Sequence, residues 1–380
     1  MRQKNETRLT MDSRIEKLAN MMVNYSCELK PGEHVMVRYD GEETIPMITA
    51  LVRYIYAAGA YPYLVRSDKR LQREIILQAG DAQLDKMCEH ELALTSEMDC
   101  FLSVHATHNE YEFSDIPSER MENYFKRYAM PTVLKRMKND RWAGINYPCA
   151  SEAQAMGTSQ QAYEDFFFDV CTMDYPKMKK AAQPLADLMD RTDKVQIKGD
   201  GTDLIFSIKG IGSKICAGDH NIPDGEVFTA PVIDSVNGYI TYTTANVIDG
   251  ICHDKIRLTF KDGKIVEAES NDSARLNKKL DSDPGARYIG EFAIGFNPYI
   301  TKPMKNTSFD EKIAGSFHLT PGMSFEKAGN GNQSSIHCDL VCIQTPEYGG
   351  GEIWFDDVLI RKDGLFVLPE LEGLNPENLK

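Results

Sequence analysis

Long apolar runs are scarce in this chain of 380 residues. No stretch approaches the ~18 apolar residues that a membrane-spanning helix needs. The N-terminal stretch MRQKNETRLTMDSRIEK is polar and lacks the apolar segment of a signal peptide. The sequence therefore predicts an intracellular, cytoplasmic protein that has no membrane partner.

Cysteine pairs and an excess of positive charge are also missing. The nine cysteines are scattered singly without a CxxC pair, which excludes a zinc ribbon or a thioredoxin-type pair and is typical of a reducing compartment. The formal net charge is −14, which argues against nucleic acid or an anionic membrane as a partner. The charge by itself favours no particular substrate.

Several familiar catalytic signatures are absent as well. The glycine-containing segments GNGN (329–332) and GGG (349–351) fit neither a P-loop nor a dinucleotide-binding loop. No GxSxG segment marks a serine hydrolase. His90 and Glu91 begin like the zinc-binding HExxH helix, but the residue at position 94 is leucine. Any catalytic site must therefore be built from residues that are far apart in the sequence.

The N-terminal half alternates between short apolar segments and amphipathic ones. Four segments have the composition of strands: KPGEHVMVRYD, AYPYLVR, DCFLSVHA and RWAGINYP. Helical spacing is found at about 14–29, 44–58, 69–78, 82–91 and 121–137. This alternation predicts a parallel sheet with helices on both faces.

From about residue 159 to residue 191 the pattern is helical and strongly amphipathic, and the composition changes after it. The remainder is rich in strands punctuated by Gly, Asn and Asp, and the segments KDGK and RKDGLF are typical of hairpin turns. We therefore predict an α/β N-terminal domain with a parallel sheet, residues 1–192, and a β-rich α+β C-terminal domain, residues 193–380.

One short segment, SSIHCDLVCIQ, combines a histidine and a carboxylate in a pattern that predicts a strand. Alternate side chains of a strand share a face, so His337 and Asp339 would point the same way. An imidazole beside a carboxylate suits zinc, cobalt, manganese or iron. A buried structural His–Asp pair is the alternative.

Three further residues in the C-terminal half could take part in such a site. Glu226 follows a Pro-Asp-Gly turn, where acidic residues are common for structural reasons alone. Glu291 lies within the apolar segment RYIGEFAIGF, so if buried it must be paired, protonated or metal-bound. His318 lies between Phe317 and Leu319, where a histidine can equally be an ordinary core residue.

Four motifs in order, NIPDGEVFTAP, GEFAIGFNP, a Glu-then-His segment and IHCDL, resemble the M29 family of metallo-aminopeptidases, also called aminopeptidase T. The resemblance covers nearly the whole chain and is densest after residue 201. It implies a two-metal centre, with Glu291 as the bridging carboxylate and the role of Glu311 left open. The implied metal ligands are Glu226, Glu291, His318, His337 and Asp339, with Glu311 as a further candidate.

The resemblance also implies other properties. The ions would be zinc or cobalt, with manganese or magnesium as alternatives, and the protein would be a homodimer whose active sites face an enclosed cavity. The family has a tyrosine seven residues after its first histidine, whereas this chain has Phe325. A phenol there could donate a hydrogen bond to a tetrahedral oxyanion, and the loss of such a donor typically costs ~2.7–4 kcal/mol.

These observations together favour a metal-dependent aminopeptidase that removes N-terminal residues from peptides with a metal-activated water. Glu291 and Glu226 would be its catalytic carboxylates, and Glu291 would pass a proton to the leaving amine. One alternative is a mononuclear non-haem iron dioxygenase that uses His318, His337 and Asp339. Another is a peptide-binding homologue in which Phe325 has weakened or abolished turnover.

Overall fold

A computed structural model of the chain describes residues 12–109, 111–248 and 251–380. The chain forms two compact units, and it passes from one unit to the other after Thr172, after Gly218 and after Ile222. The first unit comprises residues 1–172 and 219–222, and the second comprises residues 173–218 and 223–380. The domain boundary near residue 193 stays a prediction.

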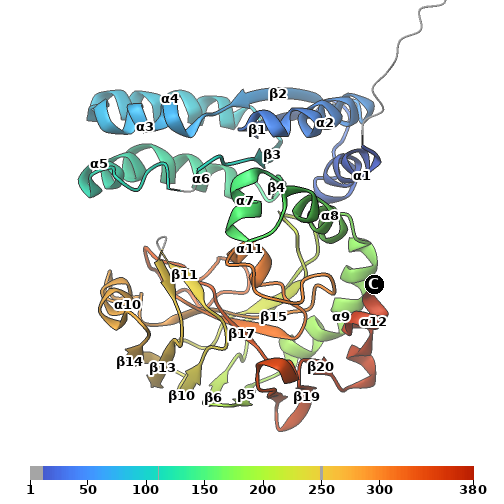
Figure 1. Ribbon diagram of the computed structural model, residues 1–380, viewed down its shortest axis with the longest axis vertical. Coiled ribbons are helices and arrows are strands. Elements are labelled where there is room, and N and C mark those ends of the chain that lie inside the picture. The colour runs from blue at the N-terminus through green and yellow to red at the C-terminus, as the bar shows by residue number, and fades with distance from the viewer. Residues whose placement is uncertain (1–11, 110, 249–250) are drawn as a thin grey trace, which may run out of the picture. The chain divides into compact units, whose positions relative to one another are not determined.

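The first unit is built on a parallel sheet of five strands in the order β2-β1-β3-β4-β8 (Figure 1). The central strand β3 is almost entirely buried, as expected when helices cover both faces of a sheet. The strands are β1 (His34–Tyr39), β2 (Tyr61–Arg66), β3 (Cys100–His105), β4 (Trp142–Asn146) and β8 (Asn221–Ile222).

The helices of the first unit follow the expected positions but are more divided. The segment at 121–137, predicted to be helical with an interruption at Pro131, consists of α5, a π-helical turn at Phe125–Ala129 and α6, and Pro131 lies in the first turn of α6. The α-helices are α1 (Ser13–Met21), α2 (Ile45–Ala57), α3 (Lys69–Gln78), α4 (Asp81–Ser96), α5 (Ser118–Tyr124), α6 (Met130–Met137), α7 (Ala150–Ala155) and α8 (Gln160–Cys171).

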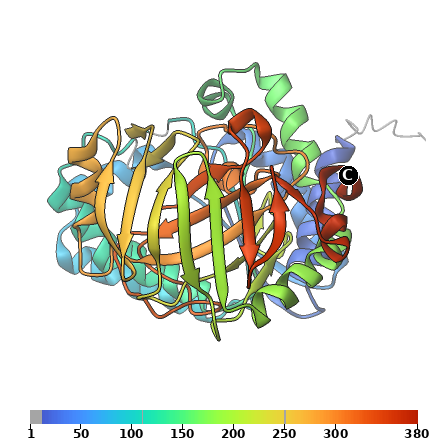
Figure 2. The ribbon, with the colours of Figure 1, turned by 90° about the horizontal axis from the view of Figure 1, so that it is seen from below.

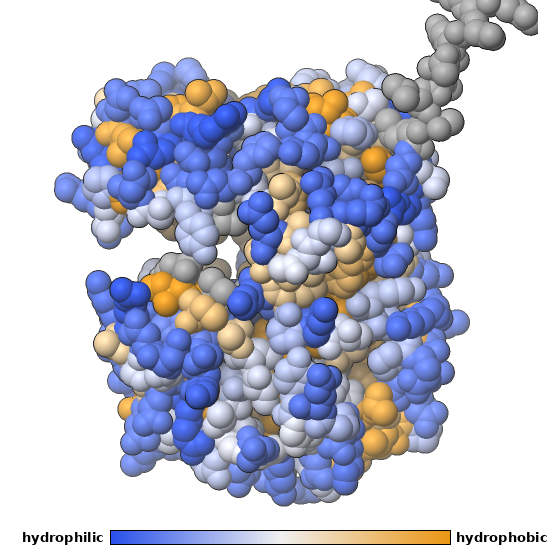
Figure 3. Space-filling model, viewed as in Figure 1, coloured by the Kyte–Doolittle hydropathy of each residue, from blue (hydrophilic) through white to orange (hydrophobic). Residues whose placement is uncertain are grey.

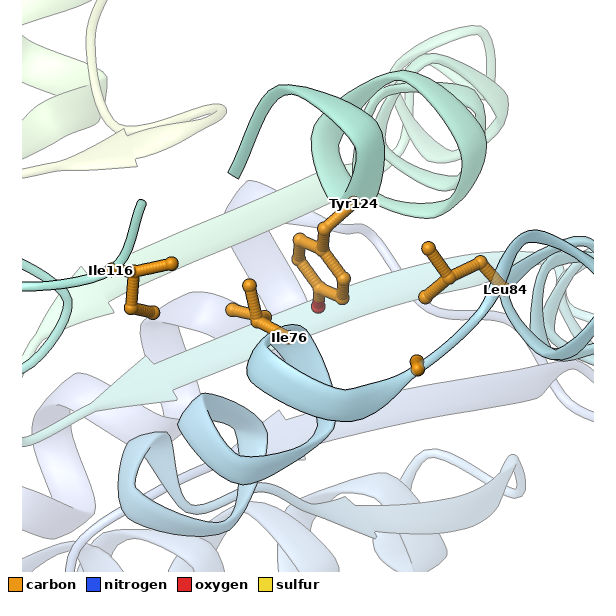
Figure 4. Packing of buried hydrophobic residues seen from close by; sticks show 5 residues of the cluster. Ile76, Leu84, Ile116 and Tyr124 are labelled. Carbon is orange, nitrogen blue, oxygen red and sulfur yellow. The ribbon is translucent and has the colours of Figure 1, made fainter. Parts of the chain in front are cut away.

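Part of this helical layer has a small core of its own. In Figure 4, four buried side chains are directed toward a common centre. They are Ile76 of α3, Leu84 of α4, Tyr124 of α5, and Ile116, which precedes α5. Burial of each such side chain contributes on the order of 1.5–3 kcal/mol. The layer that covers the sheet is therefore a packed structure and not a set of independent helices.

The second unit begins with α9 (Tyr175–Arg191), which Asp174 caps at its N-terminus. The helical segment expected at 159–191 thus consists of two helices, α8 and α9. A sheet of eight strands follows in the order β14-β13-β10-β6-β5-β18-β19-β20, seen face on in Figure 2. Its strands are β5 (Lys194–Gly199), β6 (Thr202–Ser207), β10 (Asn237–Thr241), β13 (Arg257–Lys261), β14 (Lys264–Glu269), β18 (Glu352–Phe355), β19 (Val358–Lys362) and β20 (Leu365–Phe366).

The two predicted hairpin turns are confirmed in this sheet. Asp262–Gly263 joins β13 to β14, and Asp363–Gly364 joins β19 to β20. All four residues have positive φ angles, from 49° to 83°, as two-residue turns of this kind require.

A second sheet of this unit is antiparallel, has five strands and is largely buried. Its order is β17-β16-β15-β9-β7, and the strands are β7 (Lys214–Cys216), β9 (Glu226–Thr229), β15 (Ile289–Gly295), β16 (Ser316–Pro321) and β17 (Leu340–Ile343). The remaining elements are the hairpin β11 (Asn246–Ile248) and β12 (Ile251–His253), and the helices α10 (Ser273–Leu280), α11 (Thr307–Asp310) and α12 (Pro376–Leu379).

Among the described residues, no helix combines the length and the apolarity that a bilayer crossing needs. On the face drawn in Figure 3, hydrophilic residues predominate and hydrophobic residues occur in small groups.

Candidate metal centre

The five-stranded sheet of the second unit places three of the predicted ligands on one face. Ala293 of β15 lies opposite His318 of β16, and Gly295 lies opposite Glu226 of β9. Because alternate residues of a strand share a face, Glu291 points the same way as Ala293 and Gly295. The register therefore brings Glu226, Glu291 and His318 to one side of the sheet.

These three side chains are buried and in mutual contact. His318 Nε2 lies 3.0 Å from Glu291 Oε1 and 3.6 Å from Glu226 Oε2. The side chain of His318 is fully buried, and those of the two glutamates are 5–6% exposed. One ligand atom from each residue lies within 4.8 Å of the others, an arrangement that one divalent cation could join.

Gly295 makes room for the next part of the site. A Cβ atom at this position would lie 2.8 Å from the carbonyl oxygen of Glu311 and 2.6 Å from Ser316 Oγ. Both distances are shorter than real Cβ contacts. Any side chain at position 295 would therefore displace the segment that carries Glu311.

The segment that holds His337 and Asp339 is only partly a strand. A strand is predicted across the whole of SSIHCDLVCIQ, but β17 begins at Leu340, and His337 forms an isolated bridge with Gly322. The predicted strand is wrong at its N-terminal end, because Ser335 binds the carboxylate of Asp283 through both its backbone N–H and its hydroxyl instead of joining a sheet.

His337 nevertheless faces the same cluster. Its Nε2 atom lies 3.3 Å from Asp339 Oδ1 and 3.8 Å from Glu291 Oε2. Its Nδ1 atom lies 2.8 Å from the carbonyl oxygen of Met323. A carbonyl only accepts, so Nδ1 carries a proton and Nε2 is the nitrogen presented to the site, as in many metal-binding histidines.

A second group of three donors shares His318. Glu311, His318 and Asp339 each have one ligand atom within 4.8 Å of the others. Glu311 follows directly after α11, and Thr320 Oγ1 donates a hydrogen bond of 2.6 Å that fixes Asp339 Oδ1. All six residues chosen from the sequence thus lie in one cluster within the second unit.

Lys312 is a member of the site that the sequence analysis did not select. Its Nζ atom lies 2.5 Å from Glu226 Oε1, 2.9 Å from Glu311 Oε1 and 3.7 Å from Asp224 Oδ1, and the side chain is 2% exposed. Its ammonium thereby lies against two members of a further donor group, Cys216, Asp224 and Glu226. Lys312 neutralises the two carboxylates of this group. Burial raises the pKa of its third member, the Cys216 thiol, which favours the protonated form over the thiolate. The available signal was that Lys312 follows Glu311 in a segment that is otherwise apolar after it.

The carboxylates dominate the electrostatics of the cluster. For His318, burial disfavours the charged ring, but Glu291 and Glu226 outweigh this effect and raise its pKa to about 9. For His337, burial is likewise outweighed by Asp339, and the pKa rises to about 10. Burial raises the pKa of Glu311 to about 8. The cluster therefore favours positive charge within it.

The residues fit a metal-binding role on the evidence of their unused atoms. Glu226 Oε2 and Glu291 Oε2 are buried and have no hydrogen-bond partner among the described residues. Such atoms are costly in a folded protein unless something binds them. Carboxylate and imidazole donors are the ligands that zinc, cobalt and manganese share.

Phe325 lies beside the cluster, at the position where a tyrosine was expected from the resemblance. The centroid of its ring is 4.9 Å from that of His337 and 5.9 Å from that of Phe228. An aromatic ring is therefore retained next to a candidate ligand, but without the hydroxyl group.

The chain is similar in sequence to several bacterial aminopeptidases. It is 25% identical to aminopeptidase PepS of Streptococcus thermophilus over 388 residues, which cover 86% of this chain and 91% of that protein. It is 25% identical to aminopeptidase 2 of Geobacillus stearothermophilus, with 83% and 84% covered. It is 23% identical to aminopeptidase T of Thermus thermophilus, with 86% and 91% covered.

Solved structures share the fold. Wild-type AmpT from Thermus thermophilus superposes with a TM-score of 0.74 at 21% identity, covering 94% of this chain and 99% of that one. A 2,5-dihydroxypyridine dioxygenase from Pseudomonas putida superposes with a TM-score of 0.60 at 15% identity, covering 95% and 99%. The predicted combination of a parallel-sheet α/β part and a β-rich part is thereby confirmed.

The model of one protein family spans most of the sequence. It is described as thermophilic metalloprotease (M29), and it matches residues 11–352. The resemblance inferred from the four motifs is confirmed by this match: the chain belongs to the M29 family of metalloproteases.

Proposed function

We propose that this chain is an aminopeptidase that hydrolyses the N-terminal residue of peptides with water activated by two divalent metal ions. The observation that carries the proposal is the convergence of six carboxylate and imidazole side chains, with His318 among them, in one cluster. Two groups of three donors meet at that residue, which together with His337 supplies enough ligand atoms for two ions. The aminopeptidase names of its relatives support the same class of substrate.

The proposed ligands are divided between the sheet and the two segments beside it. Glu291 lies between the two histidines and is the natural bridging carboxylate. When bound, zinc, cobalt, manganese or magnesium would lower the pKa of a coordinated water and polarise the scissile carbonyl. The proposed ligands are Glu226, Glu291, His318, His337, Asp339 and Glu311.

Proton transfer is assigned to Glu291. As the oxygen of water bonds to the carbonyl carbon, the carboxylate accepts the proton that the water loses, and it delivers this proton to the leaving nitrogen as the C–N bond breaks. Glu226 is a second catalytic carboxylate that Lys312 holds in place. The surplus of carboxylates over the single lysine favours a substrate with a cationic N-terminus.

A mononuclear iron dioxygenase is the second candidate, because a solved structure with that title shares the fold. Its triad would be His318, His337 and Asp339. The contacts of Glu226 and Glu291 with His318 argue against it, since one iron needs neither glutamate.

The test is to strip the purified protein with a chelator, reload it with zinc, cobalt, manganese or magnesium, and measure metal content and hydrolysis together. Aminoacyl arylamides and dipeptides should be cleaved with about two ions per chain, and their N-acetylated forms should not be cleaved. Glu291→Gln should lower kcat at least a hundredfold, on the scale of a lost general base. The exposed Glu267 of β14 supplies a control, Glu267→Gln, that should leave kcat unchanged.

Two outcomes would contradict the proposal. One iron per chain with oxygen consumption would favour the dioxygenase, and peptide binding without turnover under any metal would favour a non-catalytic homologue. Homodimeric assembly and a cytoplasmic location stay predictions, which light scattering and cell fractionation would check.

A further inference from the structure

A cavity of about 250 Å³ lies within the first unit, and every residue that lines it belongs to that unit. It is formed between one face of the parallel sheet and helix α6. Pockets for drug-sized ligands measure about 300–1,000 Å³, so this one suits a small molecule.

The floor of the cavity is an apolar row across three strands. Met36 of β1 lies opposite Phe101 of β3, and Phe101 lies opposite Trp142 of β4. Residues that are opposite one another share a face of the sheet, so the three side chains form one continuous surface. Val133 and Met137 of α6 are four residues apart, lie on one side of the helix and complete the apolar lining.

Two arginines give the cavity a positive end. Arg38 lies two residues beyond Met36 on the same face of β1, and Arg136 projects from α6. Both donate to the same oxygen of Glu91, Arg136 over 3.4 Å. The side chains of the two arginines are only 20–23% exposed.

The charges at this end do not balance. Two guanidinium groups share one carboxylate, and of the described residues that line the cavity only Arg38 and Arg136 are charged. Arg38 Nε is buried without a hydrogen-bond partner among the described residues. Burial, and after it the nearby charge of Arg38, lower the pKa of Arg136, whereas Glu91 acts in the opposite direction.

We propose that this cavity binds a small apolar monocarboxylate, of the size of 3-phenylpropionate or smaller. Its hydrocarbon part would lie on the row of Met36, Phe101 and Trp142, and its carboxylate would bind Arg38 and Arg136. Guanidinium groups bind carboxylates strongly because two parallel N–H donors match the two oxygens. An anion bound by the two guanidinium groups would offset the second positive charge that Glu91 alone leaves over.

Trp142 provides a direct reporter of binding. The chain has two tryptophans, so Trp354→Phe leaves Trp142 as the single tryptophan, whose emission is selected by excitation at the red edge of the absorption band. Titration of this variant with 3-phenylpropionate should give a saturable change in emission, with Kd below about 1 mM. The neutral alcohol 3-phenylpropan-1-ol and the cation 3-phenylpropylamine have the same ring and should bind at least tenfold more weakly.

Four variants in the Trp354→Phe background separate binding from folding. Arg136→Met should weaken binding at least tenfold, and Arg136→Lys should recover part of the loss. Val133→Phe keeps the charges but fills the cavity and should abolish binding. Arg127→Met removes another partly buried arginine, which pairs with Asp81 and Asp85 and does not line the cavity, and should leave Kd unchanged.

The proposal is overturned if the three probes bind equally, if none of them binds to protein with normal circular dichroism, or if Val133→Phe binds as well as its parent. Hydrolysis of peptides is not part of this test, so its outcome is independent of the metal centre.

Discussion

Position 325 is where a single side chain separates this chain from the expected pattern. The Phe325 ring packs 4.9 Å from the ring of His337, so it occupies the place where a phenol could reach a reacting carbonyl. Phenylalanine keeps the apolar contact with Phe228 but donates no hydrogen bond. The oxyanion that forms during hydrolysis then depends on other donors.

We predict that Phe325→Tyr raises the kcat of the metal-loaded enzyme. An oxyanion donor is worth about 2.7–4 kcal/mol, which corresponds to a gain of about 10²–10³ if the new hydroxyl is well placed. Steady-state kinetics with an aminoacyl arylamide measure the change, and KM should stay nearly constant because the bond forms mainly in the transition state. Phe228→Tyr adds a hydroxyl to the neighbouring ring and is the control. An unchanged kcat would mean that another group already stabilises the oxyanion.

At the scale of residues, sequence patterns indicated the candidate ligands more readily than the groups that contact them. Glu291 was selected because a carboxylate within an apolar strand needs a partner, and the structure gives it His318. Lys312 was missed because its one signal, a lysine that follows a glutamate just before an apolar segment, is weak. Its contacts with Glu226 and Asp224, more than 85 residues away in the sequence, arise only from tertiary packing.

At the scale of elements, the short loop before His337 is held by one carboxylate. Asp283 Oδ2 accepts hydrogen bonds from Ser334 Oγ at 2.9 Å, from Ser335 N at 2.7 Å and from Ser335 Oγ at 2.6 Å. Burial alone would raise the pKa of Asp283, but these hydrogen bonds outweigh it and lower the pKa below its usual value. The loop therefore depends on the charged form of this residue.

We predict that Asp283→Asn loosens the loop and misplaces His337. Hydrogen bonds to a charged group contribute about 1.5–3 kcal/mol, so amide hydrogen exchange at residues 334–337 should accelerate about tenfold or more. A carboxylate whose pKa is lowered by folding stabilises the folded state at pH values above its pKa in the unfolded chain, which is about 4 for aspartate. As the pH falls below about 4 and Asp283 is protonated, the wild type should therefore show the same loosening.

Mass-spectrometric hydrogen exchange at neutral pH measures the effect of the variant. Asp281→Asn, two residues away, removes a carboxylate that is 60% exposed and pairs with Arg287, and it should leave this loop unchanged. Equal exchange in all three proteins would show that the loop is held by other contacts.

The regular elements were predictable because local patterns determine them, and the irregular ones were not. The hairpin turns at Asp262–Gly263 and Asp363–Gly364 carry their own signal. The beginning of β17 carries no such local signal, because Ser335, just before His337, binds a residue that is 52 positions away in the sequence. Long-range contacts of this kind decide where a strand begins, and one sequence does not reveal them.

At the scale of the whole molecule, each unit has its own sheets and one tryptophan. Trp142 belongs to the parallel sheet of the first unit, and Trp354 belongs to β18 of the second, which also holds the candidate metal centre. A ligand that binds only the folded state raises the stability of the part that it binds, by about 2.7 kcal/mol at a hundredfold excess over Kd. The emission of Trp142 and that of Trp354 can therefore show which of the two units a bound ligand stabilises.

We predict that the two units unfold in separate transitions and that metal shifts only one of them. Urea unfolding of Trp142→Phe, followed through Trp354, should move to a higher midpoint when zinc replaces a chelator. Unfolding of Trp354→Phe, followed through Trp142, should keep its midpoint, because all six candidate ligands lie in the second unit. His337→Ala should reduce the shift seen through Trp354. Coincident transitions that both respond to zinc would show instead that the units unfold as one cooperative body, despite their separate sheets.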